Sequence, residues 1–198
     1  MTLAVCSIAA IATTVARPGA RVARTLQIFR DPFVPGIGQS LLPVSRRDQI
    51  KLSDGELREL LETERIAVVS TNGARGWPHS MPLWFVPRDG EVWIWTYAKS
   101  QKVRNLERDP RATVLVEAGR EYGELRGAMV EAEARLHRDF ETVIGFAEEL
   151  TVRYAEGISS VEGDARAALE AQAPKRVAIQ FVPTRVATWD HRKLGGRY

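Results

Sequence analysis

The chain has 198 residues, of which 44% are hydrophobic and 27% charged, as is typical of a globular domain with a substantial core. Its net charge of +3 comes entirely from residues 1–45, where four arginines face the single acid Asp31. The remaining body is neutral, so it lacks the basic surface of a nucleic-acid-binding protein, and no such partner is expected.

Residues 1–45 are interpreted as an N-terminal extension to one domain over 46–198. The apolar run from Leu3 to Val15 is too short to span a bilayer, and its arginines follow it instead of preceding it as in a secretory signal. Cys6 is the only cysteine, which excludes an intrachain disulfide and the multi-cysteine zinc patterns. We therefore expect a cytoplasmic protein without membrane partner or metal. A disordered extension or misassigned start, a targeting peptide and a docking arm remain open for this segment.

The first half of the body predicts one helix and then closely spaced strands. Ser53 and Glu56 form a capping box, which predicts a helix to about residue 64. Turn residues separate the segments that follow, because glycine tolerates the positive φ of tight turns. Pro78 and Pro82 place the second strand at a sheet edge or interrupt it, since proline cannot donate to a ladder. The predicted strands are 66–71, 77–86, 92–97 and 112–117, with a short helix over 100–106.

The second half adds a long strand, two helices and closing strands. Residues 125–136 are interpreted as a strand, although Ala and Glu make a helix conceivable. Helices are predicted at 139–154, capped by Asp139, and at 165–173, and strands at 176–182 and 186–189. Short consecutive strands joined by hairpins favour an antiparallel barrel over βαβ units. Trp84 and Trp95 are expected inside this barrel, and Glu131 and Glu133 on a solvated strand face.

One segment, Thr96 to Asn105, predicts an anion site. It leaves a strand and opens a helix, whose first N–H groups are unpaired and carry partial positive charge. The hydroxyls of Thr96 and Ser100 can donate to phosphate oxygens, and Lys99, Lys102 and Arg104 add cationic donors. A solvated, charged helix on a surface turn is an equally good interpretation of this segment by itself.

Two blocks of sequence carry a resemblance to a known family. The first is His79-Ser-Met-Pro-Leu-Trp-Phe85, and the second runs from Trp95-Thr96 through Ser100-x-Lys102-x-Arg104-Asn105-Leu106 to Asp109-Pro110-Arg111. Together they resemble the pyridoxamine 5'-phosphate oxidase-like superfamily over roughly residues 52–189. The resemblance implies an α+β, mainly β fold, an antiparallel split β-barrel with flanking helices. It also implies a homodimer with a flavin or deazaflavin between the subunits.

The resemblance assigns cofactor contacts by position. Ser80, Met81 and Pro82 would lie along the cofactor ring, and Thr96, Ser100 and Lys102 would bind its phosphate. Arg126 and Gly127 would reach the ring from the partner subunit, and Trp189 would lie near the substrate pocket. The departure is Gln101, where the flavin-binding oxidases carry arginine.

With only the lysine kept, the block is similar to the branch that uses the deazaflavin coenzyme F420, whose acidic tail could meet Lys99 and Arg104. The implied activity is hydride transfer to or from a small conjugated organic substrate. An FMN-dependent pyridoxamine 5'-phosphate oxidase-like enzyme and a non-enzymatic carrier of flavin, haem or another planar ligand remain alternatives. No catalytic acid or base is assigned, because His79 and His191 could donate a proton but lone histidines are more often structural.

Overall fold

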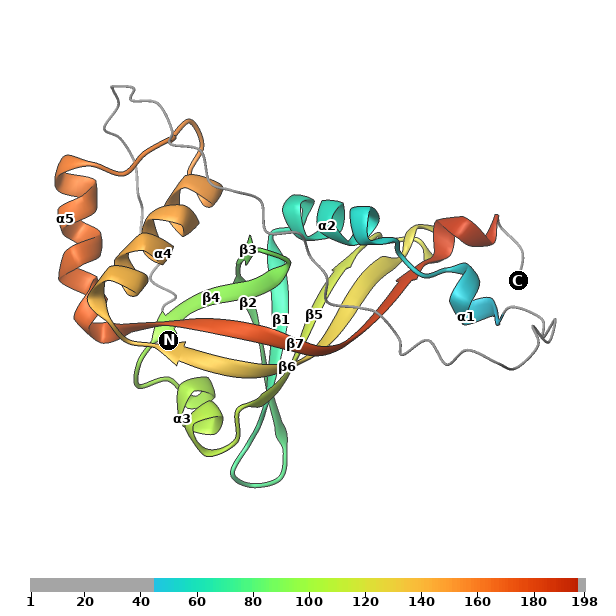
Figure 1. Cartoon of the computed structure of the whole chain (residues 1–198), viewed down its shortest axis with the longest axis horizontal. Coiled ribbons are helices and arrows are strands. Elements are labelled where there is room, and N and C mark those ends of the chain that lie inside the picture. The colour runs from blue at the N-terminus through green and yellow to red at the C-terminus, as the bar shows by residue number, and fades with distance from the viewer. Residues whose placement is uncertain (1–44, 196–198) are drawn as a thin grey trace, which may run out of the picture.

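A computed structural model describes residues 45–195, and the expected N-terminal extension lies, apart from Ser45, outside these described residues. Seven antiparallel strands form one sheet in the order β2-β1-β5-β6-β7-β4-β3. The sheet curls into a half-barrel with helices around it (Figure 1). The expected split β-barrel is therefore confirmed. The strands are β1 (Ile66–Asn72), β2 (Pro78–Trp84), β3 (Val86–Arg88), β4 (Glu91–Tyr97), β5 (Arg111–Ala118), β6 (Arg126–His137) and β7 (Arg176–Asp190).

The helices follow the capping signals in the sequence. Ser53 and Glu56 form the predicted capping box, and the Asp139 carboxylate accepts the backbone N–H of Thr142, each of which stabilises a helix by about 1 kcal/mol. The long helices are α2 (Asp54–Thr63), α3 (Gln101–Arg108), α4 (Phe140–Tyr154) and α5 (Gly163–Gln172). The short ones are α1 (Arg46–Gln49), η1 (Tyr122–Glu124), η2 (Ala173–Lys175) and η3 (His191–Leu194).

The main core lies inside the half-barrel and is closed by α2 and α3. Leu60 and Leu61 enter it from α2, and Val103 and Leu106 enter it from α3. The two helices lie at opposite ends of the half-barrel (Figure 1). A second group of apolar side chains joins α4 and α5, which pack together beside the sheet. Because α3 is fixed by this core, the side chains at its first turn are held against the end of β4.

Several sequence predictions required correction. The predicted strand 77–86 is divided at the buried Phe85 into β2 and β3, and the two closing strands form one strand, β7. Pro183 fits inside β7 because the β6–β7 register shifts there, between Glu131 and Ala132 of β6. The edge position expected for the proline-containing strand is confirmed, since β2 pairs only with β1.

The tryptophan prediction was wrong. Trp84 is 56% exposed and stacks on Tyr154 of α4, with ring centroids 4.6 Å apart. Trp95 packs against the apolar side chains of α4 and α5, and the guanidinium of Arg176 lies 4.9 Å from its ring centroid. Strand alternation decides this, because Ile94 and Thr96 take the inward positions of β4 and Trp95 points to the other face.

Candidate functional site

A buried cation lies where β4 ends and α3 begins. Lys102 is only 8% exposed, and its Nζ donates to Oγ1 of the buried Thr96 over 3.0 Å. No carboxylate among residues 45–195 pairs with it. Burial lowers the pKa of Lys102, because desolvation penalises the ammonium form. A buried ammonium whose only partner is neutral would be stabilised by a bound anion.

The hydroxyl of Ser100 lies beside this cation in sequence and has no partner. Ser100 occupies the N-cap position of α3 with extended backbone, yet its side chain accepts no hydrogen bond from the first turn of the helix. Its Oγ is buried without a hydrogen bond. Buried polar atoms in native proteins are nearly always bonded, so this oxygen is a candidate ligand group. The N-terminus of α3 therefore combines a free hydroxyl, a buried ammonium and N–H groups without a side-chain cap, which are the donors that bind phosphate.

The other polar residues of this segment have different environments. Gln101 is exposed, and its Nε2 donates to Oδ1 of Asn105 over 2.9 Å. Lys99 and Arg104 are exposed, and within the described part of the chain no acid pairs with either. They are placed to meet charge outside the barrel but do not contribute to the buried cation site.

The predicted ring strand is the free edge of the sheet. Ser80, Met81 and Pro82 are exposed on β2, and the Oγ atoms of Ser80 and Ser70 lie 2.8 Å apart. Among residues 45–195, β2 pairs with β1 alone, so its other edge offers backbone groups to a ligand. His79 precedes these residues, and its Nδ1 is buried without a partner.

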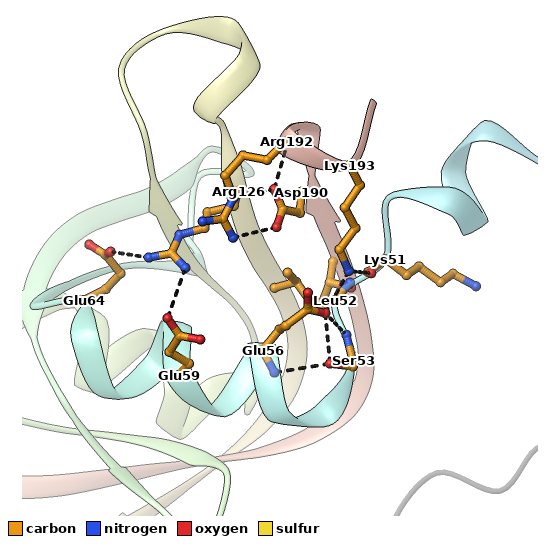
Figure 2. Close-up of polar contacts among 11 residues, drawn as sticks. Lys51, Leu52, Ser53, Glu56, Glu59, Glu64, Arg126, Asp190, Arg192 and Lys193 are labelled. Carbon is orange, nitrogen blue, oxygen red and sulfur yellow. Dashed lines mark hydrogen bonds and ion pairs between the residues drawn. The ribbon is translucent and has the colours of Figure 1, made fainter. Parts of the chain in front are cut away.

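A second cluster contains Arg126, Gly127 and Trp189. Gly127 of β6 pairs with Trp189 of β7, and a Cβ at Gly127 would lie 2.3 Å from Cζ2 of that indole. Gly127 therefore has to be glycine for the ring to lie across β6. Arg126 lies 3.9 Å from a carboxylate oxygen of Glu59 on α2 and 3.9 Å from one of Glu64, the residue that follows α2 (Figure 2).

Contacts that join residues 190–193 to residues 50–56 lie next to this second cluster. Asp190 is 2% exposed, and its carboxylate accepts two hydrogen bonds from the guanidinium of Arg192 (Figure 2). Lys193 donates to Glu56 at the start of α2. The backbone N–H of Asp190 also donates to the carbonyl of Ile50. These contacts fix the end of β7 and so fix the strand position of Trp189.

The two clusters lie far apart in one protomer. Thr96 pairs with Val177 of β7, whereas Trp189 lies 12 residues further along that strand. At a rise of about 3.3 Å per residue, this is about 40 Å along the strand path. The structure therefore brings Thr96, Ser100 and Lys102 together and places Arg126, Gly127 and Trp189 elsewhere.

Surface hollows lie outside both clusters. A hollow of about 370 Å³ lies on the outer face of β1, β5 and β6, and one of about 770 Å³ lies between the β3–β4 hairpin and α4. No predicted cofactor residue lines either of them. No three His, Cys, Asp or Glu side chains of residues 45–195 gather as a metal site requires. None of the helices described is long and apolar enough to cross a bilayer.

Residues 53–190 match the family model described as pyridoxamine 5'-phosphate oxidase. The chain belongs to the pyridoxamine 5'-phosphate oxidase family. The match spans the strands and helices from the Ser53 cap to Asp190, so it includes both clusters. This family includes oxidoreductases. No curated protein matches the chain.

Solved structures agree with this family assignment. A conserved hypothetical protein, Rv2991 of Mycobacterium tuberculosis, is 33% identical, with a TM-score of 0.71 and coverage of 78% of this chain and 94% of that one. An F420 reductase is 22% identical, with a TM-score of 0.51 and coverage of 65% and 94%. The haem storage protein HutZ of Vibrio cholerae is 16% identical, with a TM-score of 0.54 and coverage of 69% and 96%. The last two show a shared fold alone.

Asn105 lies in the block that resembles the family, but no role was predicted for it from the sequence. The structure buries it completely and bonds its amide to both Gln101 and Thr71. A signal was present, because an amide on the same helical face as Val103 and Leu106 is a polar residue at a core position. Thr71, at the end of the first strand, gave no signal of its own.

Proposed function

We propose that this protein is an oxidoreductase that uses F420, or FMN as the alternative, for hydride transfer to or from a small conjugated organic substrate. The observation that carries the proposal is the buried, uncompensated ammonium of Lys102 beside the unpartnered hydroxyl of Ser100. Both coenzymes present a phosphate, and that group would supply the missing negative charge and acceptor atoms. Thr96 would hold Lys102 in place.

In this proposal the coenzyme lies between two copies of the chain. Its ring would run along the free edge of β2 at Ser80, Met81 and Pro82, near the phosphate site of the same protomer. Arg126 and Gly127 would reach the ring from the second copy, with Trp189 beside them. Two observations support a homodimer: the distance between the clusters in one protomer, and the exposed apolar side chains Trp77, Met81 and Trp84 at the β2 edge.

The coenzyme would supply the hydride chemistry, and this chain would supply binding, orientation and exclusion of water. Lys102, Ser100 and the first turn of α3 would hold the phosphate end. The Trp189 indole, fixed across Gly127, would cover part of the substrate space and keep it dry. His79 and His191 remain candidate proton donors; His191 Nδ1 lies 3.0 Å from the carbonyl of Tyr122, and His79 Nδ1 has no partner.

Two features favour F420 over FMN. Position 101 carries the neutral Gln101, so Lys102 is the one charged side chain of residues 100–102. Lys99 and Arg104 are exposed cations near the same helix end, where they could meet an acidic tail. The fold shared with an F420 reductase is consistent with this choice. The fold shared with a haem storage protein keeps a carrier of planar ligands as the second candidate.

The test is a fluorescence titration of the full chain with F420 and with FMN. Preferential binding of F420, followed by turnover with reduced F420 and quinone or enone acceptors, would support the proposal as stated. Preferential FMN binding would replace F420 by FMN and direct the assays to oxidase activity. Binding of neither coenzyme, with saturable binding of haem, would reject the oxidoreductase in favour of the carrier.

A further inference from the structure

A buried amide ties α3 to the sheet. Asn105 is 0% exposed, its Nδ2 donates to Oγ1 of Thr71 on β1 over 3.0 Å, and its Oδ1 accepts from Gln101 over 2.9 Å. Both ends of the amide are therefore used. Removing one partner of such a buried pair leaves the other unsatisfied, which is more costly than the net value of the bond itself.

The contact continues from β1 to β2. Thr71 is 2% exposed and pairs with His79 across the two strands, and its Oγ1 donates to the His79 carbonyl over 3.4 Å. Ser80 follows His79 directly. A continuous set of polar contacts thus runs from the helix that carries Lys102 to the edge strand that carries Ser80, Met81 and Pro82.

Apolar packing alone would hold α3 on the barrel, because Val103 and Leu106 already enter the main core. Such packing is non-directional and tolerates small shifts of a helix along a strand. A fully satisfied amide is directional and selects one position. The apolar contacts attach α3 to the barrel, and the Asn105–Thr71 bond in addition fixes the position of α3 relative to β1.

We infer that Asn105 is a positioning residue for the cofactor site. It sets the spacing between the phosphate-binding start of α3 and the ring-binding edge of β2, and it acts through Thr71. This inference rests on the proposed function, since it requires one ligand to contact both elements. A ligand that contacts β2 alone does not depend on this spacing.

The experiment compares ligands with and without the phosphate. Dissociation constants are measured for FMN and riboflavin, and for F420 and its phosphate-free deazariboflavin, with the wild-type chain and with Asn105→Leu and Thr71→Val. The affinity that the phosphate adds should fall about tenfold in either variant, because a misplaced helix loses one charge-assisted contact. Binding of the phosphate-free ligand should stay unchanged, and Thr71→Ser should restore the wild-type values.

Two further variants separate positioning from general loss of stability. Leu169→Ala removes a buried side chain between α4 and α5, so it should lower the thermal midpoint without changing the phosphate contribution. The double variant Asn105→Leu/Thr71→Val should lose less of the phosphate contribution than the sum of the two single losses, because both substitutions remove the same Asn105–Thr71 bond. An unchanged phosphate contribution in Thr71→Val, or equal losses for ligands with and without phosphate, would overturn the inference. If the wild-type chain binds neither ligand pair, the proposed function itself fails.

Discussion

Trp189 lies across Gly127, its partner on the neighbouring strand, so closely that a Cβ there would come within 2.3 Å of the indole. Trp189 can take this orientation because Gly127 has no side chain. The neighbouring Arg126 and Asp190 hold ion pairs that fix the two strand ends around it (Figure 2). This makes the Gly127–Trp189 pair a rigid surface where the proposed second copy would contribute to the site.

Gly127→Ala should displace the indole and destabilise the protein. The added methyl group overpacks a strand pair whose backbone cannot retreat, which costs about 1–3 kcal/mol. Thermal denaturation should show a lower midpoint, and coenzyme affinity should fall as well. Gly145→Ala on α4 is the matched control, because a Cβ there meets nothing within 4 Å. In a Trp189→Ala background the Gly127→Ala change should cost almost nothing; an undiminished cost would mean that the indole is not the obstacle.

Lys102→Met should stabilise the protein without coenzyme while weakening coenzyme binding. The substitution removes a buried ammonium that has no carboxylate partner, so desolvation no longer opposes folding. Loss of the phosphate contact should reduce affinity by about 1.5–3 kcal/mol. Arg104→Met, which removes an exposed cation from the same helix, should leave stability nearly unchanged.

The difference in stability between Lys102→Met and the wild type should decrease as the pH rises. Burial places the pKa of Lys102 in the folded state below its usual 10.5, so the unfolded chain binds this proton more tightly. Wild-type stability should then rise with pH between the folded pKa and 10.5, and the advantage of Lys102→Met should shrink over that range. Urea denaturation from pH 7 to pH 10 measures this; a gap that widens with pH would contradict the burial of the ammonium.

Two binding-deficient variants should complement each other if the site is shared between copies. Lys102→Ala and Arg126→Ala affect different clusters, so each homodimer should lose binding at both sites. After unfolding, mixing and refolding in equal amounts, half the dimers should be mixed, each with one intact site, which restores about a quarter of all sites. Titration of the mixture measures the restored fraction. No restoration, despite mixed dimers in native mass spectrometry, would place the complete site within one protomer.

The contact between Lys193 of η3 and Glu56 at the start of α2 should weaken in acid. The hydrogen bond from Lys193, helped by the N–H and hydroxyl of Ser53, lowers the pKa of Glu56 from 4.5 to about 2, and Arg192 lowers the pKa of Asp190. A carboxyl with a lowered folded pKa stabilises the protein above its unfolded pKa, and this contribution is lost as the pH falls through the folded value. The stability advantage of the wild type over Glu56→Gln should therefore be full at pH 6 and decline between pH 4.5 and 2.

Denaturation at a series of pH values measures this decline. Glu133→Gln is the control, since Glu133 is exposed on β6 and forms no ion pair with another described residue. A difference between wild type and Glu56→Gln that stays constant down to pH 2 would mean that the Lys193 contact does not contribute in solution.

The sequence by itself determined the local elements and the fold class. Caps at Ser53 and Asp139, glycine turns and the prolines of β2 act within a few residues, so their consequences can be read without the rest of the chain. The long strand predicted over 125–136 was confirmed as β6, and the antiparallel barrel expected from consecutive hairpins and from the family resemblance was confirmed as well. The convergence of Thr96, Ser100 and Lys102 was also local, since all three lie within residues 96–102, at the end of one strand and the start of one helix.

Only the tertiary structure decided which distant residues meet. Strand alternation placed Trp95 on the face covered by α4, against the expectation that it lies inside the barrel. The pairing of Asn105 with Thr71 depends on how α3 lies across β1, and the distance of Trp189 from Lys102 depends on the length of β7. These relations join residues 12 or more positions apart, where chain packing and strand register, rather than local preference, determine the contact.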